Sequence, residues 1–180
     1  MTEATLCVFV SCGSTYTPAQ EEFARSVELH LKSHGCEPQT VGRNVYSIRQ
    51  PAEAVRDVIA KCDGSVVIAF ERTRILCALE KPDSAQQKKI DHASHPTVWN
   101  QMEAAMAYAC EIPLLIFVEK GLTREGMLSD RLEWNAVETD LSPSLLVEES
   151  FRQVFNEWIS LMRSRRSKVV FPKILPISGA

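Results

Sequence analysis

Glu103 is the carboxylate whose surroundings best suit chemistry. It lies one turn into a predicted helix at residues 98–110, and its neighbours at helical spacing are Trp99, Ala107 and Cys110. A partly desolvated glutamate can act as a base, a nucleophile or a stabiliser of a cation. The alternative is a solvated glutamate that the helix N-terminus stabilises. The same spacing predicts a core face composed of Val98, Met102, Ala105, Met106 and Ala109.

A hydroxyl-rich loop follows the first predicted strand and precedes a helix that begins at Pro18. Backbone N–H groups and hydroxyls before a helix can bind phosphate or ribose oxygens, or they can simply cap the helix. We take both readings as open. The candidate ligand-binding residues of this loop are Ser11, Gly13, Ser14, Thr15 and Tyr16, with Thr17 beside them. Neither a Walker loop nor a GxGxxG motif is present.

Two arginines and two aromatic residues complete the candidate site. Arg72 and Arg74 follow the third predicted strand, where they can hold a pyrophosphate or remain surface arginines. Tyr16 and Trp99 can stack on a base or pack structurally. His92 is three residues from His95, but beyond Asp91 no carboxylate or cysteine has metal-site spacing, so we expect no metal.

The elements that must position these residues alternate between strands and helices. Continuous apolar runs predict buried strands at residues 5–11, 65–70 and 113–118, with weaker strands at 37–41 and 134–138. We therefore predict a flavodoxin-like α/β fold, a doubly wound five-stranded parallel sheet of order 2-1-3-4-5 with helices on both faces. Ligands bind such sheets beyond the carboxyl ends of the strands, where the strand order reverses.

Two other segments are less regular. Residues 71–96 are predicted to form a long, polar loop. The last helix is predicted at residues 150–163, and residues 168–180 contain Pro172 and Pro176 among apolar residues. We expect one domain at residues 1–167 and an extended C-terminal arm at residues 168–180. The arm is expected to pack on its own domain or on a partner, which would make a homo-oligomer possible.

Composition narrows the classes of partner. The chain has 180 residues and a formal net charge of −3, which argues against a nucleic-acid groove. It has no apolar run of membrane-spanning length and no basic, apolar leader after Met1, so we expect a cytoplasmic protein with no membrane partner. The six cysteines show no metal-type clustering, and free thiols are expected.

Residues 99–117, around Glu103, resemble the glutamate, small-residue and Pro-strand block of nucleoside 2-deoxyribosyltransferase-like and TIR-like (Toll/interleukin-1 receptor-like) proteins. Residues 8–11 resemble their first strand, and residues 55–68 resemble their helix-to-strand unit. The resemblance implies that Glu103 acts at an N-glycosidic bond, as the nucleophile of the transferases or the essential acid of NAD-cleaving TIR enzymes. The transferase D-x-G-T motif is missing, and residues 94–98 stand in its place.

The resulting hypothesis is an N-glycosidase-type enzyme that cleaves the glycosidic bond of a nucleotide, by hydrolysis or glycosyl transfer. NAD is the first candidate substrate, and no resident cofactor is expected. Two alternatives remain: a non-catalytic TIR-like domain that senses a nucleotide or binds proteins, and a flavodoxin-like FMN binder.

Overall fold

A computed structural model describes residues 4–41, 50–129 and 136–170, with side chains as far as Ser167. Five parallel strands form one sheet in the order β2-β1-β3-β6-β7. Their bounds are β1 Leu6–Cys12, β2 Cys36–Gln39, β3 Gly64–Ala69, β6 Leu114–Glu119 and β7 Ala136–Thr139. The sheet confirms the predicted doubly wound order, and β1, β3 and β6 are adjacent and parallel, as predicted.

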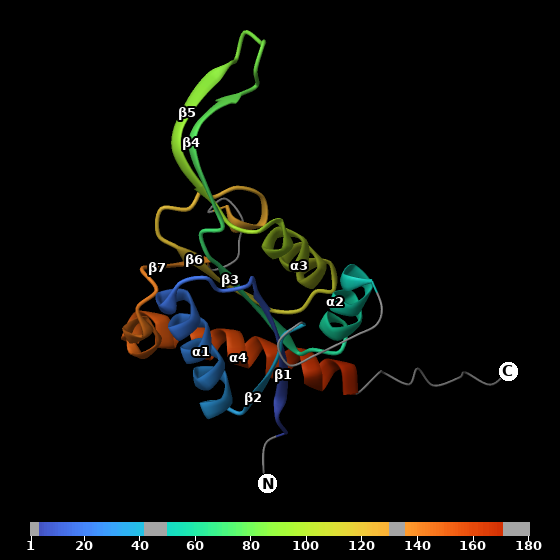
Figure 1. Ribbon diagram of the computed structural model, residues 1–180. Helices are drawn as coiled ribbons and strands as arrows, with labels where there is room; N and C mark the ends of the chain where they lie inside the picture. Colours follow the sequence, from blue (N-terminus) through green and yellow to red (C-terminus); the bar gives the residue numbers. More distant parts are fainter. Residues whose placement is uncertain (1–3, 42–49, 130–135, 171–180) are drawn as a thin grey trace, which may run out of the picture.

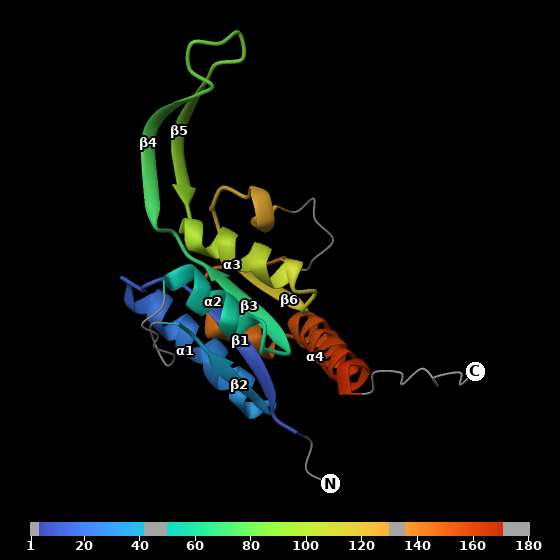
Figure 2. The ribbon, with the colours of Figure 1, turned by 90° about the vertical axis from the view of Figure 1, so that its right-hand side faces the viewer.

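Helices cover both faces of this sheet (Figures 1 and 2). Helices α1 (Pro18–Ser33) and α4 (Glu149–Val170) pack on one face, and α2 (Pro51–Ile59) and α3 (Val98–Ala109) pack on the other. Single 3-10 turns lie at Gly126–Leu128 (η1) and Pro143–Val147 (η2). The start of α1 follows the sequence signals, since Thr17 caps it and Pro18 is its first residue.

Successive strand residues bury their side chains on opposite faces, which gives the domain two core layers. Val66 and Ile68 of β3 pack beneath α1 and α4, whereas Val67 and Ala69 pack beneath α3. The central strand β3 is buried throughout its length. This two-sided burial explains why the central strands are continuous apolar runs rather than alternating ones.

The segment predicted as a long loop is instead a β-ribbon, so that prediction was wrong. Strands β4 (Thr73–Glu80) and β5 (Lys88–His95) pair antiparallel and form a separate two-stranded sheet. The ribbon stands away from the domain beyond the carboxyl edge of the main sheet (Figures 1 and 2). Its apolar side chains cover no core, so the sequence lacks the alternation that marks a half-buried strand.

The predicted core face of α3 is also wrong, except for Met106, which packs against a core cluster. The buried residues of this helix are Asn100, Ala104 and Ala107, whereas Val98 is 72% exposed and Met102 is 38% exposed. The helix carries one charged residue, Glu103, so its polar residues could not indicate which side faces solvent. We call the exposed row of Val98, Met102, Ala105 and Ala109 the α3 stripe.

Helix α4 is longer than predicted, running to Val170. Residues 168–170, predicted as the beginning of an extended arm, are therefore helical. Residues 171–180, the remainder of the predicted arm, lie outside the described residues. The predicted strand at residues 134–138 is found as β7, of which residues 136–139 are described.

Candidate functional site

Glu103 is joined to the end of β1 by a short chain of hydrogen bonds. The amide nitrogen of Asn100 donates to the hydroxyl of Ser11 (3.1 Å) and to the backbone carbonyl of Ile68 (3.3 Å). The Ser11 hydroxyl also acts on Glu103, since its interaction with the carboxyl group lowers the pKa of Glu103. Because the Ser11 oxygen accepts a hydrogen bond from Asn100, the Ser11 hydroxyl proton remains available for donation to the Glu103 carboxyl group.

The burial of Glu103 changes its acidity. Burial raises the pKa of this carboxyl group above its usual range, and the Ser11 hydrogen bond opposes part of that rise. Ser11 and Asn100 are each only 1% exposed, so both side chains lie within the core. A half-buried carboxyl group with a raised pKa, fixed by a buried donor, is an arrangement found at catalytic sites.

The first loop lies against the beginning of α3. A side chain at Gly13 would approach the methyl group of Thr97 to 3.1 Å, so Gly13 allows close contact between the loop and the residue that caps α3. Thr15 donates to the Glu21 carboxylate (2.5 Å), and its hydroxyl therefore serves the first turn of α1. Ser14 is exposed. Thr15 and Thr17 therefore serve the first turn of α1, and the ligand-binding reading stays a prediction for the other residues of the loop.

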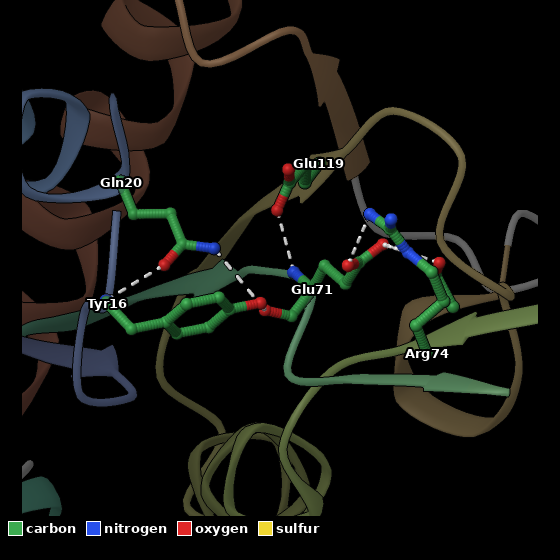
Figure 3. A network of polar contacts seen from close by, with 6 residues as sticks. Tyr16, Gln20, Glu71, Arg74 and Glu119 are labelled. Atoms are coloured by element: carbon green, nitrogen blue, oxygen red, sulfur yellow. Dashed lines mark hydrogen bonds and ion pairs between the residues drawn. The ribbon is translucent and has the colours of Figure 1, made fainter. Parts of the chain in front are cut away.

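Glu71, which follows β3, is the centre of a polar network (Figure 3). Its backbone carbonyl accepts hydrogen bonds from the Tyr16 hydroxyl and the Gln20 amide, and its backbone N–H donates to Glu119. Its side chain forms a salt bridge with Arg74 at 2.7 Å. Hydrogen bonds from Ser94 and Arg74 lower the pKa of Glu71, so this carboxylate is ionised and already neutralises Arg74.

Arg72, unlike Arg74, forms no salt bridge with Glu71. No carboxylate of the described residues pairs with Arg72, and its exposed guanidinium lies 6.0 Å from the centre of the Tyr16 ring. The two predicted arginines are therefore not equivalent: Arg74 is neutralised within the protein, and Arg72 retains a positive charge beside the first loop. Arg72 is the better candidate for binding a phosphate group.

A small pocket lies between the first loop, the end of β3 and the beginning of α3. Its volume is about 10 Å³, which is room for roughly one water molecule. Asn100 forms part of it, and the side-chain oxygen of Asn100 has no hydrogen-bond partner. The residues that line it are Gly13, Ser14, Tyr16, Phe70, Glu71, Arg72, Thr97 and Asn100.

The structure therefore brings together most, but not all, of the predicted site residues. Gly13, Ser14, Tyr16 and Arg72 line one pocket, and Ser11 connects that region to Glu103. Thr15, Arg74 and Trp99 are not among the lining residues; Trp99 is 41% exposed in the first turn of α3.

Sequence reasoning missed Asn100, Glu71 and Glu119. Glu71 and Glu119 each lie at the carboxyl end of a central strand, the position that led us to Ser11, and could have been found in the same way. Asn100 lies three residues before Glu103, one helical turn away. Its burial could not be predicted without the rotation of α3.

In the described part of the chain, no group of three or more His, Cys, Asp or Glu side chains is suitably placed to hold a metal ion. Among the described helices, none has both the length and the apolar character needed to cross a membrane.

No protein-family model and no curated protein matches this sequence. Solved structures similar to the chain include the CMP N-glycosidase BcmB of Clostridium botulinum, with 12% identity and a TM-score of 0.49 over 84% of this chain and 98% of that one. Another is the Vibrio vulnificus NanR protein complexed with ManNAc-6P, with 12% identity and a TM-score of 0.43 over 93% of this chain and 56% of that one. Both are distant similarities of fold, and neither assigns an activity to this chain.

Proposed function

We propose that this protein cleaves the N-glycosidic bond of a nucleotide, with NAD as the first candidate substrate and Glu103 as the catalytic carboxyl group. The observation that carries the proposal is the state of Glu103. It is half-buried near the carboxyl edge of the sheet, burial raises its pKa, and its carboxyl group interacts with the Ser11 hydroxyl. A carboxylate that water solvates poorly is well suited to stabilise a nearby cation, because little solvent competes with it.

In the proposed reaction, the bond between the anomeric carbon of the sugar and the ring nitrogen of the base breaks. The electron pair of this bond leaves with the base, and a positive charge develops on the ribosyl carbon, which ionised Glu103 stabilises. Water then adds to that carbon and releases a proton to the base or to solvent. The products are the free base and the sugar phosphate portion of the nucleotide.

The remaining groups have binding roles in this proposal. Arg72 and the Ser14 hydroxyl offer a cation and a donor for phosphate oxygens, and the exposed rings of Tyr16 and Trp99 can stack on a base. Because the pocket beside them has room for little more than one water molecule, substrate binding requires side chains to move. Tyr16 and Arg72 are the large exposed side chains on its border, beside the small exposed Ser14, so we expect Tyr16 and Arg72 to move first.

The direct test is release of free base from NAD, CMP and a panel of other nucleotides and nucleosides, followed by chromatography. Glu103→Gln is expected to lose about a hundredfold or more in turnover, because an amide neither carries the charge nor transfers a proton. Substrate affinity should change far less, since the carboxylate acts mainly in the transition state. Glu157→Gln, which alters an exposed carboxylate on α4, is the matched control and should leave turnover unchanged.

Three results would contradict the proposal. Full activity in Glu103→Gln would remove Glu103 from the chemistry. Binding of a nucleotide without release of any base would favour the sensing alternative, and a yellow protein with bound flavin would favour the FMN alternative. Ser11→Ala adds a graded check: loss of the orienting hydroxyl should lower turnover by about tenfold and leave the fold intact.

A further inference from the structure

Two cysteine side chains meet at the amino edge of the sheet, at the end opposite the candidate site. Cys7 lies near the beginning of β1, and Cys62 lies in the turn between α2 and β3. Their sulfur atoms are 3.2 Å apart and share a hydrogen bond. The two residues are 55 positions apart in the sequence, so the fold alone brings these thiols together.

Backbone contacts beside the two thiols fix the separation of the segments that carry them. The N–H of Asp63 donates to the carbonyl of Cys7 at 2.7 Å, and the N–H of Cys7 donates to the Asp63 carboxylate at 2.8 Å. Asp63 directly follows Cys62 in the chain. Because a disulfide has a sulfur–sulfur distance of about 2.05 Å, the two sulfurs need to approach by only about 1.2 Å.

The two thiols differ in exposure and in acidity. Cys62 is 3% exposed and packs in the core beneath α2, whereas Cys7 is partly exposed. The hydrogen bond from Cys62 and the charge of Arg166 lower the pKa of Cys7, although burial and the Asp63 and Glu37 carboxylates oppose this change. The same hydrogen bond, together with burial, raises the pKa of Cys62. Cys7 is therefore the thiol that ionises first and that an oxidant in solution can reach.

We propose that Cys7 and Cys62 form a reversible disulfide bond when the protein meets a peroxide. A metal ion does not explain the pairing of these thiols, since the described residues supply no third His, Cys, Asp or Glu placed to complete a site. The bond would tie β1 to the turn before β3, at the amino edge of the sheet. The proposal does not depend on the proposed activity, because Glu103 lies near the opposite edge.

The reaction has two steps and uses one molecule of hydrogen peroxide. In the first, the Cys7 thiolate attacks one peroxide oxygen, an S–O bond forms, and the O–O bond breaks; the hydroxide that leaves takes up a proton and becomes water. In the second, the Cys62 sulfur gives up its proton and attacks the sulfur of Cys7, and the hydroxyl group there leaves with that proton as a second water. Two thiols are thus oxidised to a disulfide, and the peroxide is reduced to two waters.

Peptide mapping of the full chain tests for this bond directly. The reduced protein is treated with hydrogen peroxide, its remaining thiols are blocked with N-ethylmaleimide in denaturant, and it is digested with trypsin. Trypsin leaves Cys7 on residues 1–25 and Cys62 on residues 62–72. Mass spectrometry should find these two peptides joined as one species, and dithiothreitol should separate them.

The matched control is Cys12→Ser, because Cys12 lies on the same tryptic peptide as Cys7. The joined peptides should persist in Cys12→Ser and in Cys110→Ser, which alters another partly exposed cysteine beside the same core cluster. They should be absent from Cys7→Ser and from Cys62→Ala. Circular dichroism establishes that each variant is folded before its peptides are compared.

Thermal melts provide a second measurement. The bond would close a long loop between β1 and β3 and restrict the unfolded chain, so oxidation should raise the Tm of the wild type by about 5 °C or more. The Tm of Cys7→Ser should not rise on oxidation.

Two results of the peptide map would overturn the proposal. One is oxidation of the exposed Cys77 while Cys7 and Cys62 are both recovered as blocked thiols, since the oxidant would then have acted without joining the pair. The other is a joined species that persists in Cys7→Ser, which would make Cys12 the partner of Cys62.

Discussion

His30 makes the protein sensitive to acid at a point far from the candidate site. Its ring lies on α1 against the aromatic rings of Phe151 and Phe155 of α4 and beside His34. Burial, together with the neighbouring His34, lowers the pKa of His30 from 6.5 to about 4. The folded protein therefore holds His30 neutral at a pH where the unfolded chain has already taken up a proton.

The sign and size of the effect follow from this difference. The stability that neutral His30 contributes is fully present above pH 6.5 and is lost as the pH falls toward 4. This difference in the pKa of His30 between the folded and unfolded states corresponds to at most about 3 kcal/mol in the free energy of unfolding. Partial exposure of the ring reduces that contribution to about 2 kcal/mol. For a chain of this length, about 2 kcal/mol is a fall in Tm of roughly 4 to 8 °C.

The measurement compares thermal melts of the wild type and His30→Phe at intervals between pH 7.5 and 4.5. The phenylalanine cannot be protonated and suits the aromatic cluster, so the variant should lose about 4 to 8 °C less than the wild type over this range. His92→Asn is the control, because it removes an exposed histidine at a φ of 57°, which asparagine tolerates. If His30→Phe and the wild type lose Tm in parallel, the reasoning about His30 is refuted.

Two further predictions concern the core and the candidate site. Gly64→Ala would bring a methyl carbon within 2.2 Å of the Met162 sulfur and 3.1 Å of the Trp158 ring. We therefore expect the free energy of unfolding, measured in urea, to fall by about 1 to 3 kcal/mol. An unchanged urea midpoint would show that α4 shifts to accommodate the methyl group at little cost. Glu103→Gln should raise Tm at pH 7, because the raised pKa of Glu103 means that its ionised form costs stability once the pH exceeds the unfolded-state value. That gain should disappear near pH 3, where Glu103 is protonated in both states, and a gain that persists there would exclude ionisation as its cause.

The central part of the fold could be predicted because its signals are local and strong. Three continuous apolar runs correctly indicate β1, β3 and β6, and the alternation with helices gives the parallel order. Thr17, Pro18 and Gly35 mark the limits of α1, where Gly35 has a φ of 76° that favours glycine. The limits of α1 could therefore be predicted without knowledge of tertiary contacts.

The ribbon and the orientation of α3 could not be predicted, because neither has a strong local signal in the sequence. Residues such as Leu76 and Ile90 on the ribbon face no core, so no alternating pattern records their strand structure. In α3, apolar residues occur on every side, and the rotation that buries Asn100 is set by contact with Ser11 and Ile68. The topology alone predicted that Ser11 and Glu103 would lie near one another. It did not predict that the Asn100 amide would lie beside Ser11.

The contact at the base of the ribbon makes the geometry of the candidate site independent of the length of the ribbon. The backbone N–H of Arg72 donates to the carbonyl of His95 at 2.8 Å, so the chain leaves the domain and returns to it at one point. Residues beyond Arg74 and Ser94, which both bond Glu71, can be added or removed in pairs without changing the distance that Glu71 and Thr97 must span. The ribbon is thus a modular insertion, suited to shortening or to the grafting of a foreign hairpin while the sheet and α3 stay in place.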